Sequence, residues 1–129
     1  MIRYFFFLGG LLGGLGVVFG AFGGHTLKAR LTPELLATFE TGVRYQMVHA
    51  LVLLIVALAP LRKPALGLLA IGGWLFVTGI VLFSGSLYLI ALSGLRVFGA
   101  ITPLGGIAFI CGWFIIALTA FRGYVNRQK

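Results

Sequence analysis

The sequence predicts an all-α integral membrane protein with four transmembrane helices. Three observations predict this class: 60% of the 129 residues are hydrophobic, only 9% are charged, and the mean hydropathy is +1.13. Such values exclude an ordinary soluble domain. The length suits one four-helix transmembrane domain over residues 1–129.

The positive charge of the chain points to lipid headgroups. Ten Lys and Arg residues against two acidic residues give a net charge of +8, which in a soluble chain would suggest nucleic-acid binding. Here the basic residues are scattered between apolar runs and form no basic face. We therefore expect membrane lipids as partners and no nucleic acid.

Apolar runs predict the four spans. A membrane helix needs roughly 20 mostly apolar residues, and we expect spans at about 4–24, 43–60, 66–92 and 99–121. The first run follows Arg3 and is about twice as long as the apolar core of a secretory signal. We therefore expect a span there and no cleaved leader.

A short interfacial amphipathic helix is predicted between the first two spans, at about 32–42. Thr32 can cap it, Pro33 suits its first position, and Glu34 is favourable in its first turn. The apolar part of the second span is too short to cross alone, so the chain should bend from this helix into the span near Gly42.

The last span repeats the same start signal. Thr102 can cap it and Pro103 can occupy its first turn. The lone cysteine, Cys111, lies inside this run, which excludes an intramolecular disulfide and a cysteine-based zinc site. We expect Cys111 to pack inside the bundle.

The basic residues predict the orientation in the membrane. If the chain crosses the membrane four times, six basic residues lie on the same side as both termini: Arg3, Arg62, Lys63, Arg122, Arg127 and Lys129. The opposite side holds four: Lys28, Arg30, Arg44 and Arg96. The positive-inside rule therefore favours cytoplasmic termini.

Glycines recur along the first span at helical spacing. The pattern at Gly14, Gly16 and Gly20 misses the dinucleotide-binding fingerprint by one residue and follows no strand, so a nucleotide loop is rejected. A row of small residues lets membrane helices approach closely. We predict packing roles for Gly13, Gly16, Gly20, Gly24 and Gly85, with lining of a narrow pore or lipid slot as the alternative.

Polar residues near the start of the second span form a candidate binding cluster. Ionisable groups within spans are costly and need a partner or a wet cavity. Glu40 and Arg44 stand four residues apart, a spacing that allows an ion pair along a helix. The predicted cluster, near the extracytoplasmic boundary, comprises His25, Glu40, Arg44, Tyr45, Gln46 and His49. The alternative is structural hydrogen bonding between helices.

The sequence shows no catalytic or cofactor motif. It has no H-E-x-x-H, no G-x-S-x-G and no paired carboxylates. Two histidines make a weak metal signal. We therefore expect no catalytic residues, no metal and no cofactor.

Four segments carry a family resemblance: "GAFGGHTLK", "FETGVRYQMVHAL", "LFSGSLYLIAL" and "GAITPLGGIAFICGW". Over nearly its whole length the chain resembles the domain of unknown function 423 family, which includes bacterial inner-membrane proteins and the eukaryotic transmembrane protein 256. His25 matches the family histidine after the glycine run, while Gly24 stands where the family often has alanine. The F-E-x-x-x-R-Y-Q-x-x-H pattern matches from Phe39 to His49. The resemblance implies four helices in a bacterial plasma membrane and no particular activity.

Three functional hypotheses follow. We favour a non-enzymatic membrane protein that binds a lipid or protein partner or supports assembly, including assembly as a homo-oligomer. The alternative is a small oligomeric transporter or channel whose polar entrance is the predicted cluster. A membrane enzyme using His25 or His49 as base and Arg44 as anion binder ranks last.

Overall fold

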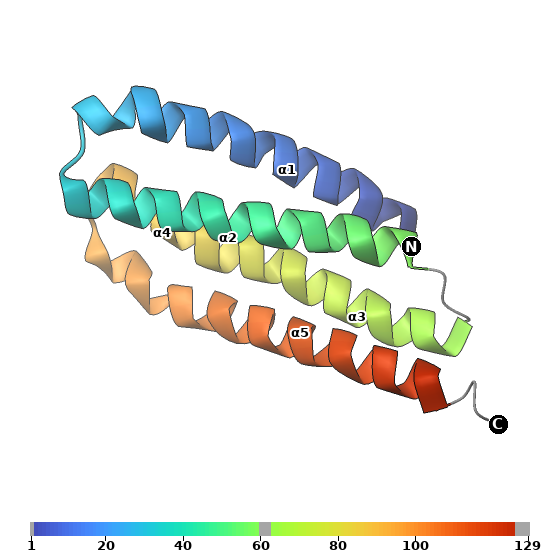
Figure 1. Ribbon diagram of the computed structural model, residues 1–129. Helices are drawn as coiled ribbons and strands as arrows, with labels where there is room; N and C mark the ends of the chain where they lie inside the picture. Colours follow the sequence, from blue (N-terminus) through green and yellow to red (C-terminus); the bar gives the residue numbers. More distant parts are fainter. Residues whose placement is uncertain (1, 60–62, 126–129) are drawn as a thin grey trace.

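The computed structural model describes residues 2–59 and 63–125, and every regular element in them is helical. The longest helices are α1, α2, α3 and α5 (Figure 1), and a π-helical turn, η2, joins α3 to α4 without a break. Short 3₁₀ turns, η1 and η3, precede α2 and α5. The bounds are α1 Ile2–His25, η1 Leu27–Ala29, α2 Pro33–Leu58, α3 Lys63–Gly79, η2 Ile80–Ser84, α4 Gly85–Ser93, η3 Arg96–Ala100 and α5 Thr102–Val125.

In the part of the chain that the structure describes, four helical stretches are long and apolar enough to cross a membrane, which confirms the predicted fold class. They are Arg3–Ala29, Pro33–Leu58, Leu66–Ser93 and Arg96–Arg122. The spans alternate in direction, so the start of α1 and the end of α5 lie at the same end of the bundle (Figure 1). Three basic residues used to predict orientation lie outside the described residues: Arg62, Arg127 and Lys129.

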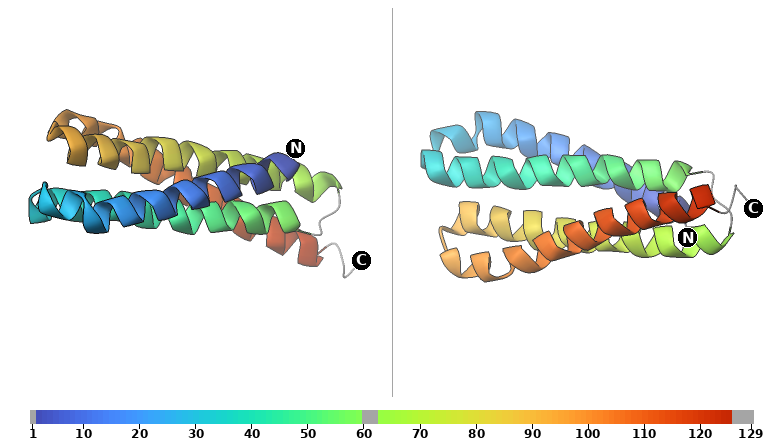
Figure 2. Two further views of the ribbon diagram at one scale, coloured as in Figure 1. Left: turned by 90° about the horizontal axis from the view of Figure 1, so that it is seen from above. Right: turned by 60° about the horizontal axis from the view of Figure 1, so that its bottom comes forward.

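The four spans pack as two pairs (Figure 2). α1 packs mainly on α2, and α5 packs mainly on α3. α2 joins the pairs because it also contacts α4, η2 and α3. α2 is therefore the central helix of the bundle.

α2 begins as predicted but does not divide as predicted. Thr32 Oγ1 accepts a hydrogen bond from Leu35 N at 3.4 Å, and Pro33 opens the helix. One unbroken helix then passes through Gly42, in place of two helices meeting there. A Cβ on Gly42 would lie 2.7 Å from the Tyr88 ring, so this glycine permits close packing against α4. An interfacial position for the first turns of α2 stays a prediction.

α5 begins at Thr102, but the predicted cap is wrong. The Thr102 hydroxyl lies 2.7 Å from Ser86 Oγ of α4 and forms a hydrogen bond with it. The preceding span ends at Gly94, whose φ of 73° is a left-handed conformation that favours glycine. The Thr102 side chain thus joins two spans across the turn.

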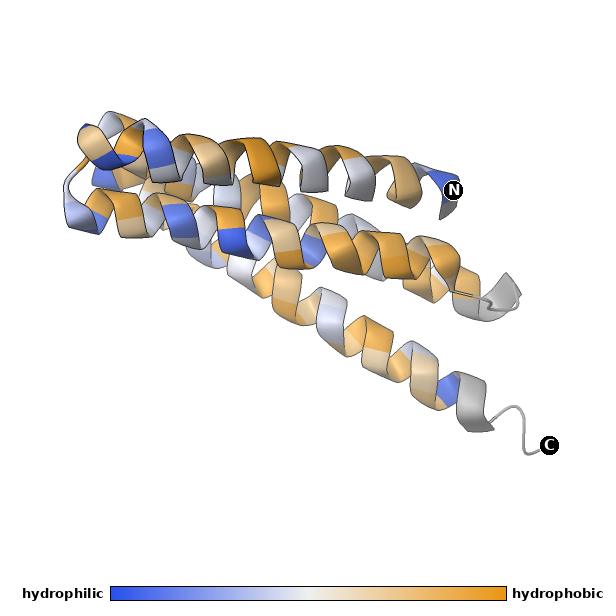
Figure 3. Ribbon diagram, turned by 45° about the horizontal axis from the view of Figure 1, so that its top comes forward, coloured by the Kyte–Doolittle hydropathy of each residue, from blue (hydrophilic) through white to orange (hydrophobic). Residues whose placement is uncertain are grey.

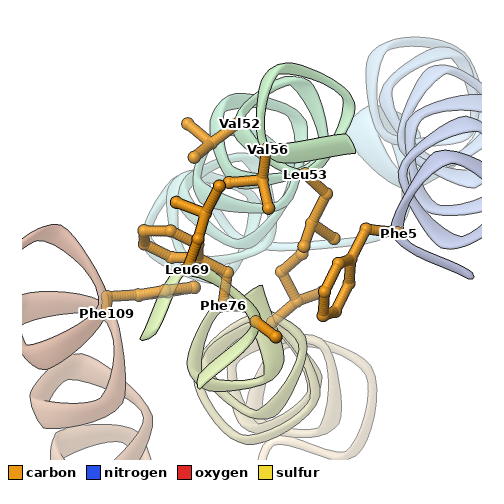
Figure 4. Close-up of a cluster of buried hydrophobic side chains, with 9 residues drawn as sticks. Phe5, Val52, Leu53, Val56, Leu69, Phe76 and Phe109 are labelled. Carbon is orange, nitrogen blue, oxygen red and sulfur yellow. The ribbon is translucent and has the colours of Figure 1, made fainter. Parts of the chain in front are cut away.

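The main apolar core lies between the two pairs. Phe5 of α1 and Phe76 of α3 are fully buried, and Phe109 contributes from α5 (Figure 4). The cluster contains Phe5, Val52, Leu53, Val56, Leu69, Ala70, Phe76, Ile80 and Phe109. A smaller cluster of Leu27, Phe39 and Ala91 forms separately.

One row of α1 glycines faces α2. A Cβ on Gly9 would lie 2.9 Å from the Ala50 carbonyl, and one on Gly16 would lie 2.5 Å from Met47 Sδ. Gly23 similarly faces the Phe39 ring at 3.2 Å. The α1 row that faces α2 comprises Gly9, Gly13, Gly16, Gly20 and Gly23. Absence of a side chain therefore brings α1 and α2 together.

Three residues expected inside the packing lie elsewhere. At Gly24 and Gly85 no atom lies within 4 Å of the position that a Cβ would occupy, so these two glycines make no close packing contact within the described part of the bundle. Gly24 lies about 100° around α1 from Gly23, beyond the row that meets α2. Cys111 is exposed on α5 and is not a core residue.

Candidate functional site

The structure separates the six predicted cluster residues into two groups. Gln46 and His49 point into the bundle and are only 3% and 4% exposed. The other four lie on the outer surface: His25, Glu40, Arg44 and Tyr45. Within residues 2–59 and 63–125 no nitrogen of Arg44 lies within 4.0 Å of an acidic oxygen, so the predicted ion pair with Glu40 is not formed.

Gln46 connects three helices through its amide. Its Nε2 donates to the Leu12 carbonyl of α1 at 2.8 Å, and its Oε1 accepts from the Tyr88 hydroxyl of α4 at 2.8 Å. A Cβ on Gly16 would lie 3.6 Å from Nε2, so this glycine leaves room for the amide. Both ends of the Gln46 side chain are thereby satisfied inside an apolar bundle.

Aromatic packing positions the Tyr88 hydroxyl. The Tyr88 ring meets Phe19 edge-on at 5.1 Å and Phe39 at 4.9 Å between centroids. Gly42 permits the approach, because any side chain there would overlap the Tyr88 ring. Residues of α1, α2 and α4 thus hold the Tyr88 hydroxyl where it donates a hydrogen bond to Gln46.

His49 is held in one tautomer. Its Nδ1 lies 2.7 Å from the Tyr45 carbonyl, which can only accept, so Nδ1 carries a hydrogen. The Trp113 indole can only donate, and it does so to Nε2 at 3.2 Å. Both bonds require the neutral ring with its hydrogen on Nδ1.

The surroundings of His49 are aromatic. Its ring stacks on Phe109 with centroids 3.6 Å apart and an interplanar angle of 10°. Phe76 lies 5.4 Å away and Tyr45 lies 6.0 Å away. A metal ion or a transferred proton at Nε2 would have to displace the Trp113 hydrogen bond.

Hydroxyl groups occupy the neighbouring interface between α4 and α5. Ser86 Oγ donates to the Phe83 carbonyl at 2.9 Å and also pairs with Thr102. Ser84 is fully buried in the π-helical turn, and its Oγ has no hydrogen-bond partner among the described residues. In this turn the Phe83 backbone also lies against Gly105 of α5.

Two partners of the buried pair were not predicted by the sequence. Trp113 and Tyr88 are not among the predicted cluster residues. In the structure the Trp113 indole donates to His49, and the Tyr88 hydroxyl donates to Gln46. The available signal was the presence of donor-bearing aromatic residues deep inside apolar runs.

The comparisons with known proteins agree on one group of membrane proteins. A family model described as "Protein of unknown function (DUF423)" matches residues 19–106, a range that includes Gln46, His49 and Tyr88. UPF0382 membrane protein YwdK of Bacillus subtilis is 42% identical over 121 residues, covering 94% of this chain and 98% of that protein. UPF0382 inner membrane protein YgdD of Escherichia coli is 36% identical over 120 residues, covering 93% and 91% respectively. No solved structure matches significantly.

Proposed function

Because this chain belongs to the DUF423 family of membrane proteins, we propose that it works within the plane of the membrane, as a non-enzymatic protein that associates laterally with another membrane protein. Its location in this proposal is the bacterial inner membrane, with both termini in the cytoplasm. The buried polar side chains support a non-enzymatic role. Each polar side-chain atom of Gln46 and His49 already forms a hydrogen bond within the bundle, so none is left without a partner to bind a substrate.

One observation carries the proposal: α1 has a second row of small residues that faces away from the bundle. Gly10 and Gly14 are exposed, and each has nothing within 4 Å of the Cβ position. At about 100° per residue, Ala21 and Gly24 continue the same stripe, in which the larger Val17 also lies. A row of glycines offers lipid tails no side chains to pack against, whereas the backbone of a second helix can approach closely along such a row.

A cross-linking experiment tests this face. A photo-reactive residue replaces Val17, which is 62% exposed, and adducts are compared with and without Gly14→Leu. We expect a protein adduct that Gly14→Leu removes without lowering the thermal unfolding temperature, because a side chain at Gly14 meets no neighbour. The control probe replaces Phe114 on α5, which is 70% exposed. Adducts at Val17 that match those at Phe114, or that survive Gly14→Leu, would contradict the proposal.

A small oligomeric transporter is the second candidate, supported by the unpartnered Ser84 hydroxyl. A fully buried hydroxyl without a partner is costly unless water or a transported group reaches it. The test measures flux of protons and small cations in proteoliposomes. Ser84→Ala should lower any flux if the protein is a transporter, whereas flux equal to that of empty vesicles would exclude transport of those ions.

A further inference from the structure

α2 has three faces, and one of them is exposed in the described part of the chain. The α1 glycines cover the first face, and α3, η2, α4 and α5 cover the second. The third is a stripe about 80° wide at 100° per residue. We call it the α2 ridge; it comprises Glu40, Arg44, Val48, Leu51, Ile55 and Leu58, all exposed.

The charged end of the α2 ridge lies within reach of the hydrocarbon region. α2 has 26 residues and is about 39 Å long, against about 30 Å for the hydrocarbon core. Arg44 lies about 21 Å from the Leu58 end and Glu40 about 27 Å from it. Figure 3 shows hydrophilic residues from the start of α2 to just beyond its middle, and an apolar stretch from there to its end.

Lipid satisfies only the apolar part of the α2 ridge. Val48, Leu51 and Ile55 can face acyl chains without cost. Glu40 and Arg44 cannot, because a charged side chain inside the membrane requires a partner. The structure places no partner for either side chain among residues 3–59 and 66–122.

We propose that a second copy of this chain covers the α2 ridge. A two-fold axis along the membrane normal would set two α2 helices side by side and parallel. Glu40 of each copy then pairs with Arg44 of the partner subunit, and the symmetry makes both pairs at once. The two residues differ in depth by about 6 Å, which an extended arginine spans.

The apolar part of the α2 ridge has the spacing of a helix-pairing seam. Arg44, Leu51 and Leu58 are seven residues apart, with Val48 and Ile55 between them. A seven-residue repeat suits two helices that cross at about 20°. The charged pairs and the apolar seam therefore belong to one continuous face.

Two other partners for Arg44 are less complete. Glu40 of the same helix stands at a suitable spacing, but the two side chains do not meet in the structure. A phospholipid phosphate would satisfy Arg44 while leaving the Glu40 carboxylate beside an anion. A second copy satisfies both groups.

This inference rests on the proposed function in one respect: both require the chain to associate with another protein within the membrane. The α1 row and the α2 ridge are different faces and have separate variants. Loss of the Val17 adducts with intact dimers, or the reverse, tells the two proposals apart.

Disulfide cross-linking in native membranes provides the first test. In a Cys111→Ala background, Val48→Cys places a thiol on the α2 ridge, and Val81→Cys places one on an exposed face of η2. Upon oxidation we expect a disulfide dimer from Val48→Cys in at least tenfold excess over Val81→Cys. Equal yields would overturn the proposal.

Charge exchange provides the second test, in the Val48→Cys background. Glu40→Arg and Arg44→Glu each give a ridge with two like charges. Each variant expressed alone should therefore give a dimer yield about tenfold lower than that of the Val48→Cys background. Co-expression of the two variants with different tags should restore the yield as heterodimers. Pairing within one helix cannot produce this restoration, nor can lipid binding.

Two further results would overturn the inference. One is a yield unchanged by either charge variant or not restored by co-expression. The other is a monomer that retains bound phospholipid in native mass spectrometry and loses it when Arg44→Glu is introduced. That result would show that Arg44 binds a lipid headgroup and not a second copy of the chain. If a charge variant fails to fold, Glu40→Gln with Arg44→Gln replaces it, and this uncharged ridge should also lose the dimer.

Discussion

Buried Gln46 and His49 differ in what their hydrogen bonds require. Gln46 both donates and accepts, so its two bonds hold at any pH at which the Tyr88 hydroxyl is protonated. His49 accepts from Trp113 only while Nε2 carries no hydrogen. Its position is therefore tied to a single protonation state.

We predict that Trp113→Phe lowers stability by about 1 kcal/mol, because it leaves the buried Nε2 of His49 without a donor. Trp74→Phe is the matched control, since Trp74 packs edge-on against Phe5 at 5.5 Å. Unfolding in detergent measures both. In wild-type protein, nitrogen NMR of the imidazole should show hydrogen on Nδ1; hydrogen on Nε2 would refute the assigned tautomer.

Gln46 and Tyr88 should be energetically coupled. Tyr88→Phe removes the donor to Oε1 and Gln46→Leu removes the acceptor, so the double variant should lose less stability than the sum of the single losses. Hydrogen bonds between membrane helices suggest a coupling of about 0.6 to 1.7 kcal/mol. Additive losses in a double-mutant cycle would show that the 2.8 Å contact contributes nothing.

Helical spacing alone predicted the polar start of α2, but it could not choose among its faces. Arg44, Tyr45, Gln46 and His49 lie within a turn or so of one another, yet the structure buries only Gln46 and His49. Which side is inward depends on where α1 and α4 pack. That information lies in Gly16 and Gly42, whose contacts become visible only in three dimensions.

At the level of elements, Gly85 at the start of α4 and Gly105 near the start of α5 should respond oppositely to alanine. A Cβ on Gly105 would overlap the Phe83 backbone, which cannot rotate away, so Gly105→Ala should cost about 1 to 3 kcal/mol. Gly85 meets nothing within 4 Å, so Gly85→Ala should stabilise the helix by about 0.5 to 1 kcal/mol. Denaturant unfolding in micelles compares them, and equal effects would contradict the packing between η2 and α5.

Start signals predicted one helix boundary well and another poorly. Thr32 and Pro33 open α2 as expected, because Thr32 Oγ1 accepts a hydrogen bond from Leu35 N in the first turn. Thr102 has the same local pattern, but Ser86 lies close enough to take its hydroxyl. A residue from a neighbouring span thus overrode a local preference.

For the whole molecule, we predict that both termini are cytoplasmic. A reporter active only in the cytoplasm should be active after Lys129 and inactive when inserted beside Arg96, because four spans separate the ends and three separate Arg96 from the first terminus. A reporter active only outside should give the opposite pattern. Activity of the outside reporter at Lys129 would reverse the orientation and leave the span count intact.

Length and hydropathy were sufficient to predict four spans, but not how the spans pair. Apolar runs in Leu66–Ser93 and Arg96–Arg122 identify helices because each is long enough to cross a bilayer. Pairing depends on contacts such as Phe76 against Gly112, where a ring fills the space that a missing side chain leaves. Such complementarity has no periodic signature in one sequence.

The division into two helix pairs also gives the chain an order of assembly during synthesis. The first 58 residues contain both α1 and α2, so the Gln46 amide can reach the Leu12 carbonyl while the ribosome is still translating the third span. The Tyr88 hydroxyl emerges later and completes the second bond. A nascent hairpin of α1 and α2 can thus leave the translocon with the Nε2 of its one glutamine already hydrogen-bonded. When α4 arrives, the Tyr88 hydroxyl supplies the donor that the Gln46 Oε1 lacks.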